Sequence, residues 1–269
     1  MKIMHPAFTR ENLDRLHKKY NRRKYVHPDP LEFLYDYHEL NNREIVALTA
    51  SSLAYGRVAR ILKSVSQVLD IMGPCPAAFL EKSSSASLRK DFREFRHRFA
   101  TGDNLAALLA GAKKIIEKYG SLHECFLAGL KRDDETLLPA LSFFAQNISN
   151  TENISCGHLI PLPERGSACK RLNLFLRWMV RKDRVDPGGW EDVPASKLII
   201  PMDVHMHRLC LGLGLTARKQ ANMRAALEVT SCFAKLVPQD PVRYDFALTR
   251  LGIRDDAAPE EFFSMSGKL

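Results

Sequence analysis

The chain of 269 residues lacks any apolar run that approaches the length needed to cross a lipid bilayer, which is about 20 residues for a helix. Its first residues, MKIMHPAFTR, also lack the apolar core of a secretory signal peptide. We therefore expect no membrane partner and a cytoplasmic location. With 45% hydrophobic and 26% charged residues, the composition is that of a globular protein, and the length allows one large domain or two lobes.

Cysteines are few and scattered, with six in the whole chain. The closest two, Cys156 and Cys169, stand 13 positions apart, so the sequence has no CxxC pair. Zinc knuckles and iron–sulfur clusters take their ligands from closely spaced cysteines. We therefore expect neither kind of site, and cysteines without an evident pairing pattern are typical of a reducing cytoplasm.

The alternation of apolar and polar residues that marks a half-buried strand is also missing. Apolar residues instead recur at helical spacing between residues that start or stop helices, such as Asp29–Pro30, Asp240–Pro241 and Gly120. The predicted fold class is therefore all-α. The pattern predicts helices over 8–24, 41–56, 58–73, 103–120, 133–148, 216–236 and 239–252, with a helix-poor segment over 149–165.

A net charge of +9 favours an anionic partner such as nucleic acid. The basic segment 88–99, LRKDFREFRHRF, would place Phe92, Phe95 and Phe99 on one helical face and its arginines on another. Two interpretations stay open: a core stripe under a solvated basic face, or a face that contacts phosphates. From Arg254 onward the chain is acidic, and we expect a surface tail there.

The segment that begins LPERGSACKRLN at residue 162 predicts a turn, at Pro163 and Gly166, that opens into an apolar helix. Lys170 stands at the start of that helix. A helix N-terminus carries partial positive charge and free N–H groups, so it suits a phosphate but disfavours a cation. A lysine in this place is explained if it is a nucleophile beside a bound phosphate.

A second segment, LIIPMDVHMHRLCLGLGL at 198–215, places Asp203 after an apolar stretch, where a helix cap would stand. Together the two segments resemble the helix-hairpin-helix (HhH-GPD) DNA glycosylases of the endonuclease III superfamily. That superfamily reads L-P-x-x-G-x-x-x-K, often with an asparagine three positions later, and then D-T-H-x-x-R. The matching residues of this chain are Leu162, Pro163, Gly166, Lys170, Asn173, Asp203, His205 and Arg208.

The resemblance implies a DNA-repair activity on damaged duplex or single-stranded DNA. In bifunctional members the lysine attacks C1′ of a damaged nucleoside, expels the base and forms a Schiff base, while the aspartate stabilises positive charge on the sugar. Lys170 and Asp203 would be this catalytic pair. The segment LTASSLAYGRVARI at 48–61 is similar to the early LLSAQ helix that lies near DNA. The implied DNA-binding residues are Arg165, Gly166, Ser167, Arg171, His205, Arg208, Ser52 and Arg57.

Departures from the superfamily pattern narrow the resemblance. Glu164 replaces the first glycine of the hairpin, which makes the hairpin imperfect. The long interval from Lys170 to Asp203, the IPMD sequence and the absence of an iron–sulfur tail are more similar to archaeal 8-oxoguanine DNA glycosylases. As a whole, the chain resembles the prokaryotic family described as a domain of unknown function, DUF2400. This implies 8-oxoguanine as the favoured lesion and no cofactor beyond a monovalent cation at the hairpin.

The resemblance also implies a two-lobed monomer. Residues 41–180 would form a helical barrel that ends in the hairpin, and residues 1–40 with 198–269 would form the second lobe, with Asp203 across a cleft from Lys170. Trp178 and Trp190 are base-pocket candidates, although core packing is the alternative for both.

Two rival functions stay open. One is a DNA-binding protein that keeps the fold without the chemistry. The other is a metal-dependent hydrolase, because Asp203, His207 and Cys210 fall on one helical face and are residue types that bind zinc.

Overall fold

The structure is a computed structural model that describes residues 4–149 and 155–253, so the acidic tail predicted from Arg254 lies outside the described residues. The fold is mostly helical, which confirms the all-α prediction. Within the described ranges the only named strands are the two-residue β1 (Arg96–His97) and β2 (Ala100–Thr101), which pair antiparallel. No helix among the described residues is long and apolar enough to cross a membrane.

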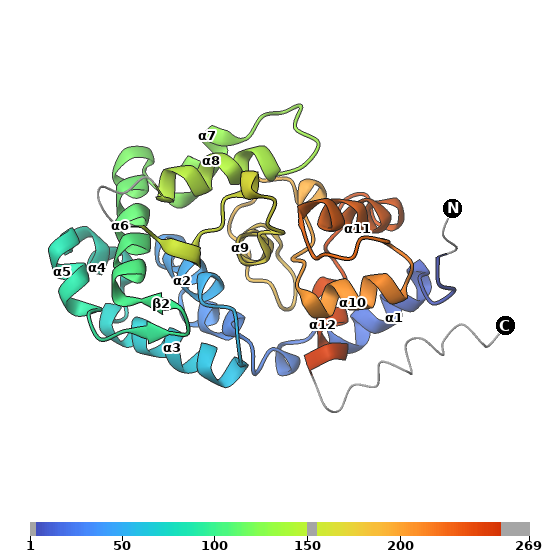
Figure 1. Cartoon of the computed structure of the whole chain (residues 1–269), viewed down its shortest axis with the longest axis horizontal. Coiled ribbons are helices and arrows are strands. Elements are labelled where there is room, and N and C mark those ends of the chain that lie inside the picture. The colour runs from blue at the N-terminus through green and yellow to red at the C-terminus, as the bar shows by residue number, and fades with distance from the viewer. Residues whose placement is uncertain (1–3, 150–154, 254–269) are drawn as a thin grey trace.

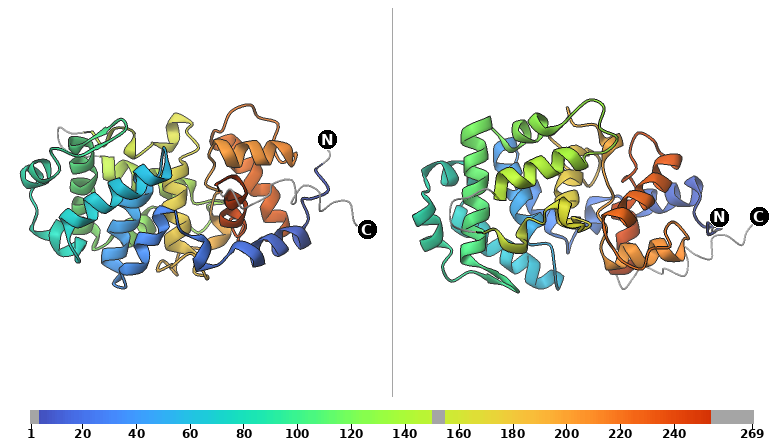
Figure 2. Two further views of the ribbon diagram at one scale, coloured as in Figure 1. Left: turned by 90° about the horizontal axis from the view of Figure 1, so that it is seen from below. Right: turned by 45° about the horizontal axis from the view of Figure 1, so that its top comes forward.

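Helix α9 (Lys170–Val180) lies in the middle of the molecule (Figure 1). On one side of it lie α2 (Leu40–Ser52), α3 (Val58–Met72), α4 (Pro76–Lys82), α5 (Ser85–Asp91), α6 (Gly102–Tyr119), α7 (Leu122–Gly129) and α8 (Leu138–Ser149). On the other side lie α1 (Arg10–Tyr20), α10 (Val204–Gly212), α11 (Met223–Leu236) and α12 (Asp245–Ile253) (Figure 2). The N-terminal helix therefore packs with the C-terminal ones, and α1 contacts α12 directly.

Short 3₁₀ helices occupy several connections: η1 (Arg23–Tyr25), η2 (Pro30–Asp36), η3 (Gly157–Leu159), η4 (Pro163–Arg165) and η5 (Ala195–Lys197). Asp29 caps η2 by accepting a hydrogen bond from the Leu31 N–H at 3.1 Å, so Asp29–Pro30 does start a helix, of the 3₁₀ type. In its described part, the predicted helix-poor segment contains η3 and η4, and its only α-helical residue there is Ser149, the last of α8.

Three predicted helices begin five or more residues later in the structure than the sequence pattern indicates. The helix predicted over 216–236 starts at Met223, because Asn222 caps it and Thr216 instead donates a hydrogen bond to Glu228. The helix predicted from residue 239 starts at Asp245, and Asp240–Pro241 belongs to a run of turns before it. The helix predicted from residue 133 starts at Leu138.

The helix predicted over 88–99 is wrong. Helix α5 ends at Asp91, and the chain then turns into the β1–β2 hairpin. Phe92 and Phe95 are buried, as the core-stripe interpretation requires, but Phe99 stands in the hairpin turn and is 76% exposed. The three rings therefore do not share a face.

Helix α9 is the core of the fold, since every residue from Leu172 to Val180 is buried. It packs on α2, whose residues from Glu44 to Ser52 are buried as well. Two arginines, Arg177 of α9 and Arg181 directly after its last residue, enter this interior and are paired there. Arg177 bridges Asp186 at 3.0 Å and Asp245 at 2.6 Å, and Arg181 bridges Asp186 and Asp240. These ion pairs tie α9 to the segment that follows it and to α12.

Candidate active site

A cleft of about 530 Å³ opens between the N-termini of α9 and α10. Its walls come from residues 28–30, from the turn after α2, from Pro201 and from α12. Both helix N-termini direct partial positive charge toward this region. Three acidic and three basic side chains line the cleft: Asp29, Asp203 and Asp245, and Lys170, Arg177 and Arg250.

Lys170 is the first residue of α9, and the turn before it is tightly constrained. Gly166 and Cys169 both adopt positive φ, 74° and 47°. Asn173, which is 1% exposed, donates through Nδ2 to the carbonyl of Ala168 at 3.0 Å and so closes the turn from inside. Asn173, three positions after Lys170, thus fixes the backbone from which Lys170 projects. The Lys170 side chain remains 31% exposed.

Asp203 approaches Lys170 from the opposite helix. It is the N-cap of α10, and its Oδ1 accepts a hydrogen bond from the Met206 N–H at 2.8 Å. Its Oδ2 lies 3.6 Å from Nζ of Lys170, and the Asp203 side chain is 28% exposed. The structure therefore brings the two predicted catalytic residues together at a solvent-accessible place.

Two ion pairs on the floor of the cleft are shorter and more buried than the pair of Lys170 and Asp203. Nη1 of Arg177 lies 2.6 Å from Oδ2 of Asp245, and Nη2 of Arg250 lies 2.8 Å from Oδ2 of Asp29. Burial raises the pKa of Asp245 and Arg177 opposes that rise. Within the described residues, Oδ1 of Asp245 and Nε of Arg250 are buried and have no hydrogen-bond partner. Lys170 and Asp203 are farther apart than these pairs, at 3.6 Å, and their side chains are more exposed to solvent.

Arg171, predicted to bind DNA, is directed into the protein instead. Its guanidinium donates to the Ser52 carbonyl at 2.9 Å and to the His158 carbonyl, and it lies 4.9 Å from the centre of the Tyr55 ring. Burial lowers the pKa of Arg171. These contacts join the start of α9 to the end of α2 and to the residues that follow it.

Ser52 must also be removed from the predicted DNA-binding residues. It is 1% exposed, and its hydroxyl is buried without a partner among the described residues. Arg57, five positions later, is exposed at the N-cap of α3, next to Gly56 and Val58 of the cleft wall. The early helix therefore presents its end to the cleft, and its interior belongs to the core.

The remaining predicted DNA-binding residues are at the surface. Arg165, Gly166 and Ser167 are exposed on the turn before Lys170, and an isolated β-bridge from Ser167 to Asn222 ties that turn to the start of α11. His205 and Arg208 are exposed on α10.

Glu164, where the superfamily has glycine, accepts hydrogen bonds from Ser142 and Gln146 of α8. That contact gives this hairpin an anchor of its own.

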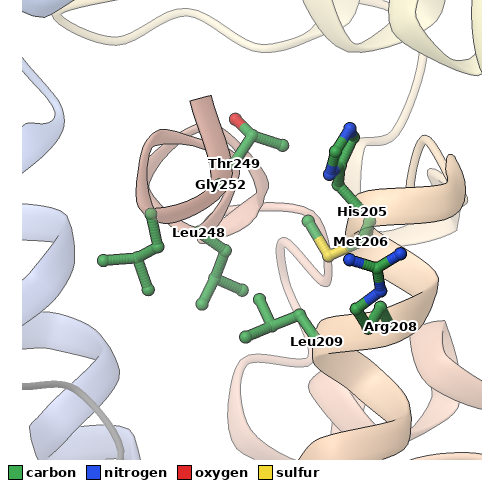
Figure 3. Close-up of a pocket in the computed structure, with 8 residues that line it drawn as sticks. His205, Met206, Arg208, Leu209, Leu248, Thr249 and Gly252 are labelled. Atoms are coloured by element: carbon green, nitrogen blue, oxygen red, sulfur yellow. The ribbon is translucent and has the colours of Figure 1, made fainter. Parts of the chain in front are cut away.

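His205 and Arg208 also border a second pocket, of about 510 Å³, between α10 and α12. Figure 3 shows side chains of the two helices pointing toward one another across it, with His205 opposite Thr249. His205 and Thr249 line both pockets, so the second pocket adjoins the cleft.

Trp178 and Trp190 are fully buried and do not line the cleft. Trp190 stacks on His123 with ring centres 5.2 Å apart and donates through Nε1 to Glu44 at 2.7 Å. Core packing is thus the role that the structure gives both indoles, and neither is positioned to contact a base in the cleft.

The residues suggested for a zinc site do not form one. Asp203 caps α10, His207 Nε2 lies 2.9 Å from the Arg218 carbonyl, and Cys210 is fully buried. Across the described ranges no group of three or more histidine, cysteine or acidic side chains is placed to hold a metal ion. The spacing along one helix did not bring these three side chains to one point.

Sequence reasoning missed most of the cleft wall and floor. Tyr55, Asp245 and Arg250 line the cleft, and their segments had been noted only for helical pattern or resemblance. Tyr55 alone carried a signal, since an aromatic residue before Gly56 at a helix end is suited to a cleft edge. Asp245 and Arg250 look like ordinary residues of an amphipathic helix, and nothing in the local sequence distinguishes them.

These observations define an all-α protein with a lysine–aspartate pair at the mouth of a cleft that is lined by charges of both signs. The chain belongs to the family described as Protein of unknown function (DUF2400), whose model matches residues 29–254. Apart from Pro28, the match spans every residue that lines the cleft, from Asp29 to Arg250. No curated protein and no solved structure matches the chain.

Proposed function

We propose that this protein is a base-excision DNA glycosylase with AP lyase activity, built on the HhH-GPD plan, in which Lys170 is the nucleophile and Asp203 its partner. The observation that carries the proposal is the 3.6 Å approach of Lys170 Nζ to Asp203 Oδ2 at the opening of the cleft. The two residues come from sequence motifs 33 positions apart, and each is fixed by its own helix start.

The geometry supports the following chemistry. Asp203 takes the proton of the Lys170 ammonium, and the freed lone pair forms a bond to C1′ as the glycosidic bond breaks. The bonding electrons leave with the base, which takes up a proton. The nitrogen, which then carries two protons, loses one of them. The C1′–O4′ bond opens as O4′ takes up a proton, and the nitrogen lone pair forms the C=N bond of the protonated Schiff base. Removal of a proton from C2′ then expels the 3′ phosphate, which is the lyase step.

Several features favour DNA as the partner. The net charge is +9, and exposed arginines stand around the cleft at Arg57, Arg165 and Arg208. Two helix N-termini at the cleft suit a phosphate on either side of the reacting sugar.

A damaged base leaves the duplex at a lower cost than a normal one, and the similarity of the IPMD segment to archaeal enzymes favours an oxidised base such as 8-oxoguanine. The proposal needs one copy of the chain and no cofactor, and a monovalent cation at the hairpin would only assist phosphate binding.

The test is covalent trapping. The protein is incubated with oligonucleotides that each carry one damaged base, 8-oxoguanine first, in the presence of borohydride. Reduction of the Schiff base should give a stable protein–DNA adduct that Lys170→Gln abolishes. Lys182→Gln removes a lysine that is 69% exposed and paired with Glu191, and this control should trap as well as wild type. An adduct that persists in Lys170→Gln would assign the chemistry to another amine.

A DNA-binding protein without this chemistry is the second candidate. One observation favours it: Lys170 and Asp203 already neutralise one another, as a purely structural pair would. The two candidates differ in the trapping experiment, since the binding protein would retain DNA affinity and yield no adduct with any lesion.

A further inference from the structure

The tip of the β1–β2 hairpin presents an unusual pair of residues to solvent. Arg98 and Phe99 form the two-residue turn between the paired residues His97 and Ala100. Phe99 is 76% exposed, the largest exposed fraction among the large hydrophobic side chains of the described part of the chain. Phenylalanine is among the residue types most often buried, so this exposed ring at a hairpin tip is available to a partner.

The turn is also strained. Arg98 adopts φ of 54°, a region that residues with a Cβ atom rarely occupy. Such outliers persist where the surrounding structure holds them, and they are concentrated at functional sites. The Arg98 guanidinium lies 5.4 Å from the centre of the Phe99 ring, so the strained turn sets a cation beside an exposed aromatic face.

The hairpin stands at the rim of the cleft. The Arg98 side chain lies across Gly56, where a Cβ atom would come within 2.8 Å of Arg98 Cδ. Gly56 and its neighbour Tyr55 both line the cleft. The Phe99 ring lies 6.2 Å from the ring of His158, whose Nε2 is 2.8 Å from the Tyr55 hydroxyl.

A buried histidine fixes the hairpin in this place. His97 is 0% exposed, and its two ring nitrogens lie 2.9 Å from Ser64 Oγ and 3.1 Å from the Tyr55 carbonyl. Tyr55 in turn donates its hydroxyl to the His97 carbonyl at 2.8 Å. Arg171, next to Lys170, packs on the same Tyr55 ring. The exposed tip and the start of α9 are therefore held in a fixed relation.

We propose that Phe99 stacks on the bases of DNA beside an extruded nucleotide, with Arg98 at the neighbouring phosphate. This inference rests on the proposed function, since it presumes that DNA enters the cleft. Every base offers a π face to an aromatic ring, and an apolar side chain inserted at a base step can kink the duplex and replace the stacking of a base that has left it. An aromatic ring and a cation at one rigid tip have the chemistry that such a step requires.

Binding to a duplex that contains a single tetrahydrofuran abasic-site analogue tests the inference without knowledge of the lesion. Phe99→Ala should weaken binding to this duplex by between about fivefold and about 150-fold, the loss expected for one stacked base. The salt dependence of binding should stay the same, because no charge is removed. Ile71→Ala, which truncates another exposed apolar residue, of α3, should bind as wild type does.

Phe99→Trp provides a second readout that does not depend on loss of affinity. Stacking of the new indole on a base should quench its fluorescence when the duplex is added. Wild type supplies the background, since Trp178 and Trp190 are fully buried. Unchanged affinity in Phe99→Ala together with unquenched fluorescence in Phe99→Trp would overturn the inference and leave the proposed function standing. If wild type bound no DNA at low salt, the proposed function would fail instead.

Discussion

Nζ of Lys170 lies 3.6 Å from Oδ2 of Asp203, while Oδ1 of the same carboxylate accepts the N–H of Met206 at 2.8 Å. One oxygen thus holds the start of α10, and the other is free to act on the lysine. The cap fixes the carboxylate whether or not Lys170 keeps its proton or forms a bond to a sugar. If Lys170 is the nucleophile, as we propose, the cap would hold the carboxylate in place while Oδ2 accepts the proton of the lysine.

Asp203→Asn separates these two functions of the carboxylate. Asparagine caps helices about as well as aspartate, so we expect the free energy of unfolding to change by only a few tenths of a kcal/mol. DNA binding should remain, but the rate of base removal should fall on the order of 100-fold, because the charge that stabilises the transition state is lost. Single-turnover cleavage and equilibrium binding measure the two effects.

Asp203→Ala is the matched control for the cap. It removes both oxygens, so it should also lose about 1 kcal/mol of stability. If Asp203→Asn cleaved DNA at the wild-type rate, the carboxylate charge would have no part in the reaction.

Arg165 should contribute to affinity and to salt dependence in a predictable way. It is exposed on the turn before Lys170, where a phosphate would lie in the proposed complex. Arg165→Ala should reduce the slope of log K against log salt concentration by about one, the change expected for one lost phosphate contact. Fluorescence anisotropy with a labelled duplex between low and physiological salt measures the slope.

Arg15→Ala serves as the control, because Arg15 is 57% exposed on α1 and pairs with Glu11 there, outside the cleft. This variant should keep the wild-type slope. Equal slopes in all three proteins would remove Arg165 from the DNA surface.

Local signals in the sequence were sufficient for most helices and for the pairing of Lys170 with Asp203. Capping residues act on their own helix within a few positions, which is why Thr9, Asp29 and the glycines after α3 and α6 could be recognised. Lys170 and Asp203 were identified by motif order, and their motifs also place each at a helix start. The structure then brought those two helix starts together.

The segment 88–99 shows where periodicity fails. Its phenylalanines fit a helical face, but the positive φ of Arg98 and the pairing of His97 with Ala100 depend on contacts with Tyr55 and Ser64. Such contacts are distant in sequence. The floor of the cleft escaped prediction for the same reason, since Arg250 meets Asp29 only in the folded chain.

The buried ion pairs around Asp186 should contribute strongly to the stability of the fold. Asp186 is 0% exposed and accepts hydrogen bonds from both Arg177 and Arg181. Asp186→Asn removes its charge and leaves two buried guanidinium groups short of a counter-charge. Breaking a buried pair in this way typically costs about 3–5 kcal/mol, and we expect a loss of this size in the free energy of unfolding measured with urea.

Glu191→Gln provides the comparison at the surface. Glu191 pairs with Lys182 at 3.1 Å, and both side chains are about 70% exposed, as is common for ion pairs that contribute about 0–1 kcal/mol. Similar stability losses in the two variants would show that the network around Asp186 is not a special element of the fold.

Glu44 should give the stability a distinctive dependence on pH. The residue is 1% exposed, and burial raises its pKa to about 7, against the effect of hydrogen bonds from Trp190, Leu122 and His123. Between pH 4.5 and 7 the unfolded chain has released this proton while the folded chain keeps it. Folding is therefore penalised progressively as pH rises through this interval, by about 3 kcal/mol in total. Above pH 7 the contribution is constant.

Glu44→Gln removes the titration, so the difference in unfolding free energy between the variant and wild type should shift by about 3 kcal/mol in favour of the variant from pH 4.5 to pH 8. Urea unfolding at several pH values measures this difference and cancels the contributions of other groups. Glu94→Gln is the control, since Glu94 is 84% exposed, and its difference from wild type should be flat. If the Glu44→Gln difference were also flat, Glu44 would be ionised at its ordinary pKa, with the three N–H donors outweighing its burial.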